Sequence, residues 1–354
     1  MDSLHQPLYS GRQWVLKTTQ RAIFFLLLCW PLSGFSHPAG EFYHQAVEAI
    51  QDQNLQQAET LLQQALTEFP AYAEAHHLLG IVRYQRTQDT NNALQALKRA
   101  VQLNPNFVQA HYDLGLLLLK QEKMKEAQQA IQQALTIYPG FWEARLTLAK
   151  SFDQTGAIDK AIQEYETVLQ QQPYASEALF HLAYHLMQRK QHDRAHDFLT
   201  RLTTHDSQHS EGWYLLGRLS EQSQKFEQAI EAYTHVVQIV PDHADAHDNL
   251  GFLYQQLHQP QQAIEHFQRV TQLKPTDDEA YVNLGVLLVH AKQFDQAEEV
   301  YQKGLALQPN SVEGQFNMGA FYEFHKADLQ KAKHHYRKYL DLGGTDGRIQ
   351  ELLK

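Results

Sequence analysis

A period of 34 residues constrains this chain more than any other feature. Prolines fall on the period in two sets, which are Pro105, Pro139 and Pro173, and then Pro241, Pro275 and Pro309. Ser207 occupies the same place between the sets, and Pro70 is displaced by one residue because the stretch 86–92 carries an insertion. Self-similarity at such a period is the signature of stacked repeats. The period runs over 39–345, with repeats starting near 39, 73, 108, 142, 176, 210, 244, 278 and 312, so almost no sequence is left for another domain.

Within each repeat the apolar residues follow helical spacing. Repeat positions 4, 7, 8 and 11 form a stripe of the kind that one face of a helix buries. Position 8 is Gly or Ala from Gly80 to Gly319, and position 20 is Ala from Ala58 to Ala297. A glycine inside a helix costs up to about 1 kcal/mol, so a small residue in every repeat indicates a second helix that crosses closely. The proline at position 32 then ends the helix pair.

This pattern closely resembles the tetratricopeptide repeat family, in which position 4 is large, 7 is Leu, 8 is Gly, 20 is Ala, 24 is aromatic or Leu, 27 is small and 32 is Pro. The resemblance implies an all-α fold, a right-handed α-solenoid of about nine helix-turn-helix units stacked into a superhelix with a concave binding face. The departures are local. The first repeat lacks the Leu-Gly pair, and the ninth carries an insertion near 324–332 and ends at Gly343-Gly344. Residues 346–354 are expected to form a short C-terminal cap that leaves apolar surface available for self-association.

Residues 1–36 have the pattern of a secretory signal peptide. Arg12, Lys17 and Arg21 precede an apolar core at 22–32, which is too short for a membrane span but suits a signal sequence. Small residues at Gly34 and Ser36 favour cleavage after Ser36. We therefore expect an exported, periplasmic protein with no membrane insertion after cleavage. The alternative is an uncleaved membrane anchor through residues 22–35.

Several classes of function are disfavoured by the sequence. The formal net charge is -10 and no Lys/Arg-rich run occurs, so we expect no nucleic-acid partner. Neither a Ser/His/Asp nucleophile motif nor a Gly-rich phosphate loop is apparent, so we expect no catalysis and no cofactor. Chaperone-binding members of the resembled family carry Lys at position 5. Position 5 here never holds Lys, which disfavours binding of acidic chaperone tails.

Positions 2, 5, 6, 9 and 13 form a second stripe on the first helix, turned away from the packing stripe. In the resembled family this stripe faces the concave groove. Position 6 holds Asn249, Asn283 and Asn317, with Asp113 at the equivalent place. Side-chain amides at regular steps offer donors and acceptors to the main chain of an extended peptide. The column is similar to the superhelical repeats of O-linked N-acetylglucosamine transferases. The alternative is that the asparagines only assist packing between repeats.

Aromatic side chains on the same stripe are expected to anchor a peptide or a partner helix. They are Tyr112, Phe180, Tyr184, Tyr214, Phe252 and Phe316. Position 2 adds an acidic column, which is either a rail for basic ligands or a set of first-turn carboxylates that stabilise the helix dipole. Its members are Glu74, Glu143, Glu177, Glu211, Asp245, Glu279 and Glu313.

Histidine is frequent, at 21 residues, and the fifth repeat holds three pairs spaced four apart. They are His181 and His185, His192 and His196, and His205 and His209. Such a pair shares one helix face and can ligate zinc, copper or nickel. No third ligand segment is apparent, so the sequence favours solvated histidines and no metal site.

The leading hypothesis is a non-catalytic protein- or peptide-binding scaffold of a bacterial-type cell envelope. It would hold a partner segment in the concave groove, with a role in assembling an envelope or secretion machine by analogy with exported relatives. A histidine-rich metal-binding protein centred on the fifth repeat, and a structural, self-associating spacer, are the alternatives.

Overall fold

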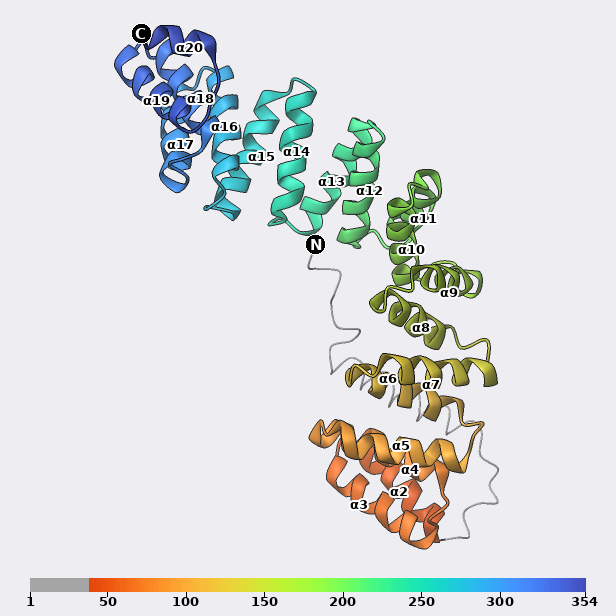
Figure 1. The fold of residues 1–354 in the computed structure, drawn as a ribbon. Coiled ribbons are helices and arrows are strands. Elements are labelled where there is room, and N and C mark those ends of the chain that lie inside the picture. The colour runs from red at the N-terminus through yellow and green to blue at the C-terminus, as the bar shows by residue number, and fades with distance from the viewer. Residues whose placement is uncertain (1–37) are drawn as a thin grey trace. The chain divides into compact units, whose positions relative to one another are not determined.

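The computed structural model describes residues 38–354, and the expected signal peptide or anchor lies outside these residues. The described part of the chain forms nineteen α-helices, α2 to α20, and no strand (Figure 1). This confirms the all-α helical-repeat solenoid that the sequence predicts. No helix within 38–354 is both long and apolar enough to cross a bilayer.

The contacts between helices divide the chain into an N-terminal unit up to His185 and a C-terminal unit from Leu186 to Lys354. The N-terminal unit contains α2 (Pro38–Gln51), α3 (Leu55–Glu68), α4 (Ala73–Thr87), α5 (Thr90–Leu103), α6 (Val108–Lys120), α7 (Met124–Ile137), α8 (Trp142–Gln154), α9 (Ile158–Gln171) and most of α10 (Ser176–Gln188). Each odd-numbered helix from α3 to α7 packs against the helix before it and the helix after it.

The C-terminal unit continues the alternation of first and second helices. It contains α11 (His192–His205), α12 (Ser210–Gln222), α13 (Phe226–Ile239), α14 (Ala244–Gln256), α15 (Pro260–Leu273), α16 (Asp278–His290), α17 (Phe294–Leu307), α18 (Val312–Phe324), α19 (Leu329–Asp341) and α20 (Gly347–Leu352). Side chains cap several first helices: Asp277 accepts a hydrogen bond from the Ala280 N–H, and Ser311 from the Gly314 N–H.

The turn between the two helices of a pair always contains one residue with positive φ. These residues are Gln53, Gln88, Glu122, Gly156, Lys190, Gln224, His258, Lys292 and Ala327. Only Gly156 among them lacks a Cβ. For the other eight, the left-handed conformation carries a steric cost of roughly 1 kcal/mol each.

The close helix crossing that the small residues at position 8 predict is present. A Cβ on Gly285 would lie 2.4 Å from Cε1 of Tyr301, and one on Gly115 would lie 2.5 Å from Cγ1 of Ile131. Tyr301 and Ile131 are the position-24 residues of the second helices. The first and second helices therefore touch backbone to side chain at this level, which is why position 8 stays small.

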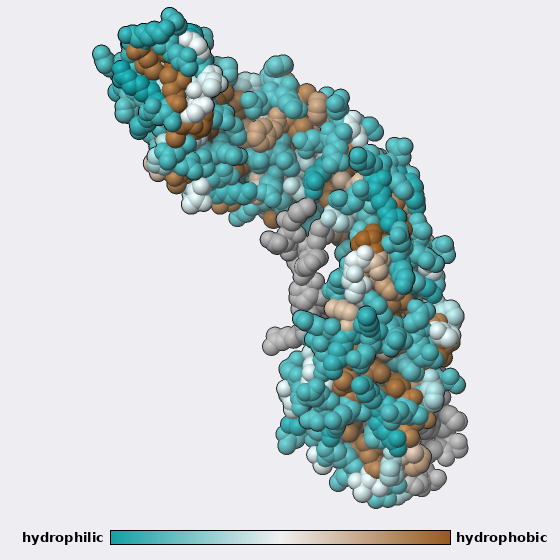
Figure 2. Space-filling model, in the orientation of Figure 1, coloured by the Kyte–Doolittle hydropathy of each residue, from teal (hydrophilic) through white to brown (hydrophobic). Residues whose placement is uncertain are grey.

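The short helix α20 covers the end of the last helix pair. Ile349 is fully buried, and Arg348 donates hydrogen bonds to both Glu323 oxygens at 2.7 and 3.0 Å. Beside this cap, Phe324 and Leu329 remain 62% and 48% exposed. Figure 2 shows apolar surface (brown) at this C-terminal end, among a mostly hydrophilic surface.

Candidate peptide-binding face

The candidate site is the set of position-2, 5, 6 and 9 residues on α12, α14, α16 and α18, which we call the first-helix face of the C-terminal unit. It carries Asn249, Asn283 and Asn317, all half-buried. α16 and α18 contact each other directly, and α14 and α16 both pack against the second helix α15 (Figure 1). The three amides therefore project from helices of one stack.

Asn249 is engaged by its neighbour from the preceding repeat. Burial and then the Asp245 carboxylate raise the pKa of Tyr214, and a hydrogen bond with the Asn249 side chain opposes this rise. This hydrogen bond joins position 5 of one repeat to position 6 of the next. Asn249 thus contributes to packing between repeats, as the alternative interpretation of the column expects.

Asn283 and Asn317 differ from Asn249. Within residues 38–354, neither side-chain amide makes a hydrogen bond. Position 5 of the preceding repeat is an acidic residue, Asp248, before Asn283 and an apolar residue, Val282, before Asn317. Val282 has no polar side-chain atom to offer, so at least the Asn317 amide is left to find its partners elsewhere.

Three aromatic side chains lie on the same face. Phe252 is the most open, at 41% exposed, and meets the Phe267 ring edge to face at a centroid distance of 5.1 Å. Tyr214 and Phe316 are half-buried, and Phe316 packs on Tyr339 at 5.3 Å. These contacts fix the rings in place while leaving part of each surface accessible.

The face becomes acidic where α14 approaches the start of α16. Burial, followed by the charges of Asp277, Asp245 and Glu279, raises the pKa of Asp248 to about 6, and Lys274 opposes the shift. Lys274 itself pairs with Asp245 at 2.7 Å. The acidic column of the sequence includes Asp245 and Glu279. It misses Asp248 and Asp277, which a search of position 5 and of the helix caps would have found.

Asp113 and Tyr112, two of the predicted binding residues, are buried in contacts between repeats. Asp113 is 1% exposed, and its Oδ2 lies 2.7 Å from Nε2 of His77. Tyr112 is 7% exposed, and its hydroxyl lies 3.1 Å from Oγ1 of Thr147. Both contacts again join position 5 of one repeat to position 6 of the next. These polar groups are buried because they satisfy each other between repeats.

Phe180 and Tyr184 lie on α10 in the N-terminal unit and are half-buried. Phe180 meets the ring of His181 edge-on at 5.5 Å, and Tyr184 meets that of His185 in the same way at 5.6 Å. They are therefore not part of the first-helix face of the C-terminal unit.

The first histidine pair of the fifth repeat, His181 and His185, is used in packing. His181 stacks on Tyr165 with centroids 5.4 Å apart, and burial is the main cause that lowers its pKa to about 4. Nε2 of His185 lies 2.6 Å from Oδ1 of Asp153, but the two atoms are not aligned as a hydrogen bond. Among residues 38–354, no group of three or more His, Cys, Asp or Glu side chains is placed to hold a metal ion.

Comparison with known families gives four matches along the chain. The family described as tetratricopeptide repeat matches residues 254–315 and, in a second model, 108–141, and the TPR repeat family matches 87–122. The C-terminal ARM domain of tetratricopeptide repeat protein 21 matches 141–279. A search of curated proteins finds no match.

The chain is also similar to several solved structures. The TPR protein YrrB, whose structure is described as having an unusual peptide-binding site, is 20% identical with a TM-score of 0.48 over 52% of this chain and 94% of YrrB. MamA is 22% identical with a TM-score of 0.44, over 47% and 91%. A tetratricopeptide repeat protein from Parabacteroides merdae is 15% identical with a TM-score of 0.46, over 70% and 97%.

Tetratricopeptide repeats bind protein or peptide partners, and proteins built from them are generally non-catalytic scaffolds. The family matches and the nine helix pairs agree on the same repeat. The chain belongs to the tetratricopeptide repeat family.

Proposed function

We propose that the C-terminal unit binds an extended segment of a protein partner across its first-helix face. Asn283 and Asn317 would donate to and accept from the main chain of that segment. The observation that carries the proposal is that these two amides, on contacting helices, make no hydrogen bond within 38–354. A half-buried amide gains most from a partner that supplies both a donor and an acceptor, and a peptide unit does so.

The neighbours of the two amides favour a segment with apolar and basic side chains. The open surface of Phe252 offers an apolar contact, and Asp248 with its carboxylate neighbours offers a site for Lys or Arg. A cation there would stabilise the Asp248 carboxylate, whose pKa is kept high by burial and then by its acidic neighbours. Asn249 is not expected to bind the segment, because Tyr214 already engages it.

We further propose that the protein works in the cell envelope. Export is supported by the sequence of residues 12–36, which has a basic flank, a short apolar core and then small residues. A role in assembling an envelope or secretion machine rests on analogy with exported relatives. Cell fractionation with sequencing of the mature N-terminus tests it. A mature protein that starts near residue 37 in the periplasm supports export, and an intact N-terminus in the cytoplasm contradicts it.

Peptides selected from a displayed random library against the full chain test the binding face. The affinity of a selected peptide is then measured by calorimetry for wild type, for the double variant Asn283→Ala/Asn317→Ala, and for Asn310→Ala, whose exposed amide lies outside the face. Losing two hydrogen bonds should weaken binding roughly 10- to 100-fold in the double variant, with Asn310→Ala unchanged.

A second comparison isolates the main chain of the peptide. Methylating single backbone nitrogens of the selected peptide removes one donor at a time without altering side chains. A methyl group on the peptide nitrogen that bonds Asn283 or Asn317 should weaken binding to wild type. The same methyl group should not further weaken binding to the double variant. Equal affinities for wild type and double variant, with both proteins folded by circular dichroism, would refute the role of the two amides.

A further inference from the structure

A depression of about 450 Å³ lies among α3, α4 and α5 of the N-terminal unit. Its volume falls in the range that accommodates a small organic molecule. Leu66, Leu79 and Ala96 supply apolar surface to it, and Leu79 and Ala96 are buried. The remaining lining residues are polar or cationic.

Two arginines and a histidine line this depression. They are Arg83 from α4, Arg99 from α5 and His76 from α4. Burial, and then the positive charges of Arg99 and Arg83, lower the pKa of His76, although its ring also bonds the Pro70 carbonyl. Both guanidinium groups are therefore close enough to the imidazole for their charges to act on it.

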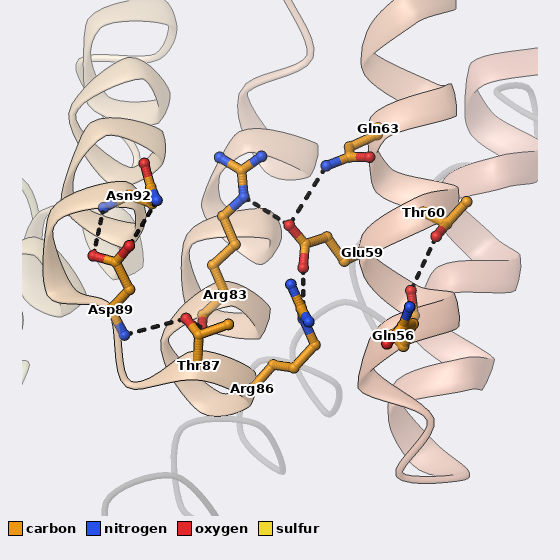
Figure 3. Close-up of polar contacts among 9 residues, drawn as sticks. All are labelled: Gln56, Glu59, Thr60, Gln63, Arg83, Arg86, Thr87, Asp89 and Asn92. Carbon is orange, nitrogen blue, oxygen red and sulfur yellow. Dashed lines mark hydrogen bonds and ion pairs between the residues drawn. The ribbon is translucent and has the colours of Figure 1, made fainter.

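The charge of Arg83 is only partly compensated. Glu59 accepts a hydrogen bond from Nε of Arg83 at 3.0 Å and another from Nε of Arg86 at 2.8 Å, so one carboxylate serves two cations. Figure 3 shows Glu59 between the two arginines, with the terminal nitrogens of Arg83 directed away from the carboxylate. The ion pair thus fixes the Arg83 side chain and leaves its terminal N–H donors available.

Arg99 has no compensating partner within the described part of the chain. It makes no hydrogen bond or ion pair among residues 38–354 and is exposed at the edge of the depression. In a chain of net charge -10, a depression edged by two arginines and backed by one shared carboxylate is locally cationic. Guanidinium groups bind carboxylate and phosphate oxygens through paired N–H donors.

We propose that this depression binds a small organic anion, with a carboxylate or phosphate group between Arg83 and Arg99 and an apolar body against Leu66 and Leu79. Thr67, Gln63 and Gln95 also line the site and add neutral polar groups beside the acid group. Arg86 shares Glu59 with Arg83 but does not line the depression, so it is the matched control. The proposal is independent of peptide binding in the C-terminal unit.

The experiment titrates the full chain with phenyl phosphate, benzoate, inorganic phosphate and phenol. Calorimetry measures affinity, and the His76 Cε1–H resonance, assigned with His76→Gln, reports the site by nuclear magnetic resonance. Phenyl phosphate, benzoate or both should bind and raise the pKa of His76, because the anion offsets the field of the arginines. Tighter binding of phenyl phosphate would identify a phosphate site, and tighter binding of benzoate a carboxylate site. Inorganic phosphate should bind at least several-fold more weakly, because it lacks an apolar body.

Arg99→Gln should weaken anion binding roughly 10-fold or more, and Arg86→Gln should leave it within about twofold. Arg99 is exposed, so its replacement is not expected to disturb folding, and circular dichroism checks this. Anion binding that is equal in wild type and Arg99→Gln overturns the proposal. So does phenol binding as tightly as the anions, or an unchanged pKa of His76 at saturating anion.

Discussion

The phenolic hydroxyl of Tyr233 donates a hydrogen bond to the Glu221 carboxylate at 3.1 Å, which ties a second helix to the last turn of the first helix in its pair. The same bond occurs between Tyr165 and Asp153 at 2.6 Å. It recurs between Tyr336 and Glu323, also at 2.6 Å. Burial, followed by the neighbouring carboxylate, raises the pKa of Tyr233, so its hydroxyl stays protonated and remains a donor.

Replacing Tyr233 by Phe is expected to lower the free energy of unfolding by about 1–2 kcal/mol, because a hydrogen bond to a charged acceptor is lost. Tyr301 is the matched control. It occupies the same repeat position, but the residue that corresponds to Glu221 in its repeat is Val289, which offers no acceptor. Tyr301→Phe should change stability by less than about 0.5 kcal/mol. Urea titrations of the two variants under identical conditions make the comparison, and equal losses would contradict it.

Adding a methyl group at Gly285 should destabilise the chain, although alanine is normally the better helix former. The new Cβ would lie 2.4 Å from Cε1 of Tyr301, a ring held in the core. We expect Gly285→Ala to cost about 1–3 kcal/mol through overpacking. Gly347→Ala in α20 meets no atom within 4 Å and should be neutral or slightly stabilising. Thermal unfolding of both variants tests the contrast; a stabilised Gly285→Ala would show that Tyr301 can move aside.

Asp248 should make stability fall as the pH rises. Its pKa is raised to about 6 in the folded chain by burial and by Asp277, Asp245 and Glu279, against an ordinary value of 3.8. The folded state therefore holds this proton more tightly than the unfolded state does. The resulting stability is fully present below pH 3.8 and is lost as the pH rises through about 6.

Asp248→Asn removes this loss. Because Asp248 is partly exposed, screening by solvent reduces the effect to about 1 kcal/mol of added stability at pH 7. The difference between variant and wild type should vanish toward pH 4. Urea denaturation at pH 4, 5, 6 and 7 measures it, and a difference that stays constant with pH would rule out Asp248 as the titrating group.

Arg348 should decide whether α20 stays docked. Besides Glu323, it donates to the Tyr336 hydroxyl at 3.2 Å, and its guanidinium lies 5.3 Å from the ring centre of Phe324. Arg348→Ala is expected to speed amide hydrogen exchange in residues 347–352 by roughly 10-fold, with exchange in α16 unchanged. Lys354→Ala, which removes only an exposed pair with Glu351, should have no such effect. Unaltered protection in Arg348→Ala would mean that burial of Ile349 suffices.

The sequence predicts the helix pairs well because their signals are local and repeated. Proline and glycine punctuation, together with the position-8 and position-20 columns, specify which faces pack, and the distances at Gly285 and Gly115 agree. The hydrogen-bond partner of the position-6 side chain, by contrast, is not determined by its own repeat. Whether its amide is free depends on the residue at position 5 of the preceding repeat, so Asp113 is buried against His77 whereas Asn317 follows Val282 and stays unpaired.

The tyrosine–carboxylate pairs can also be predicted from the sequence. An acidic residue at position 12 accompanies a tyrosine at position 24 in two repeats, Asp153 with Tyr165 and Glu221 with Tyr233. Glu323 accompanies Tyr336, which the insertion in the ninth repeat shifts by one residue. Val289 accompanies a tyrosine without a bond. Aligning the repeats against each other at these two positions shows the pairing. The depression bounded by Arg83 and Arg99 cannot be predicted from the sequence, because its lining residues come from three helices and from unrelated repeat positions.

The eight side chains held at positive φ between paired helices have a consequence for how this protein has evolved. Glycine, the residue that relieves the strain, occurs at only one of the nine turns, Gly156. Selection has therefore left a series of simple stabilising substitutions unused, as expected for a protein kept just above the stability that its work requires. Under selection for stability at higher temperature, these turn residues could change to glycine one at a time. Such changes would leave the first-helix face and the packing between helices unaltered.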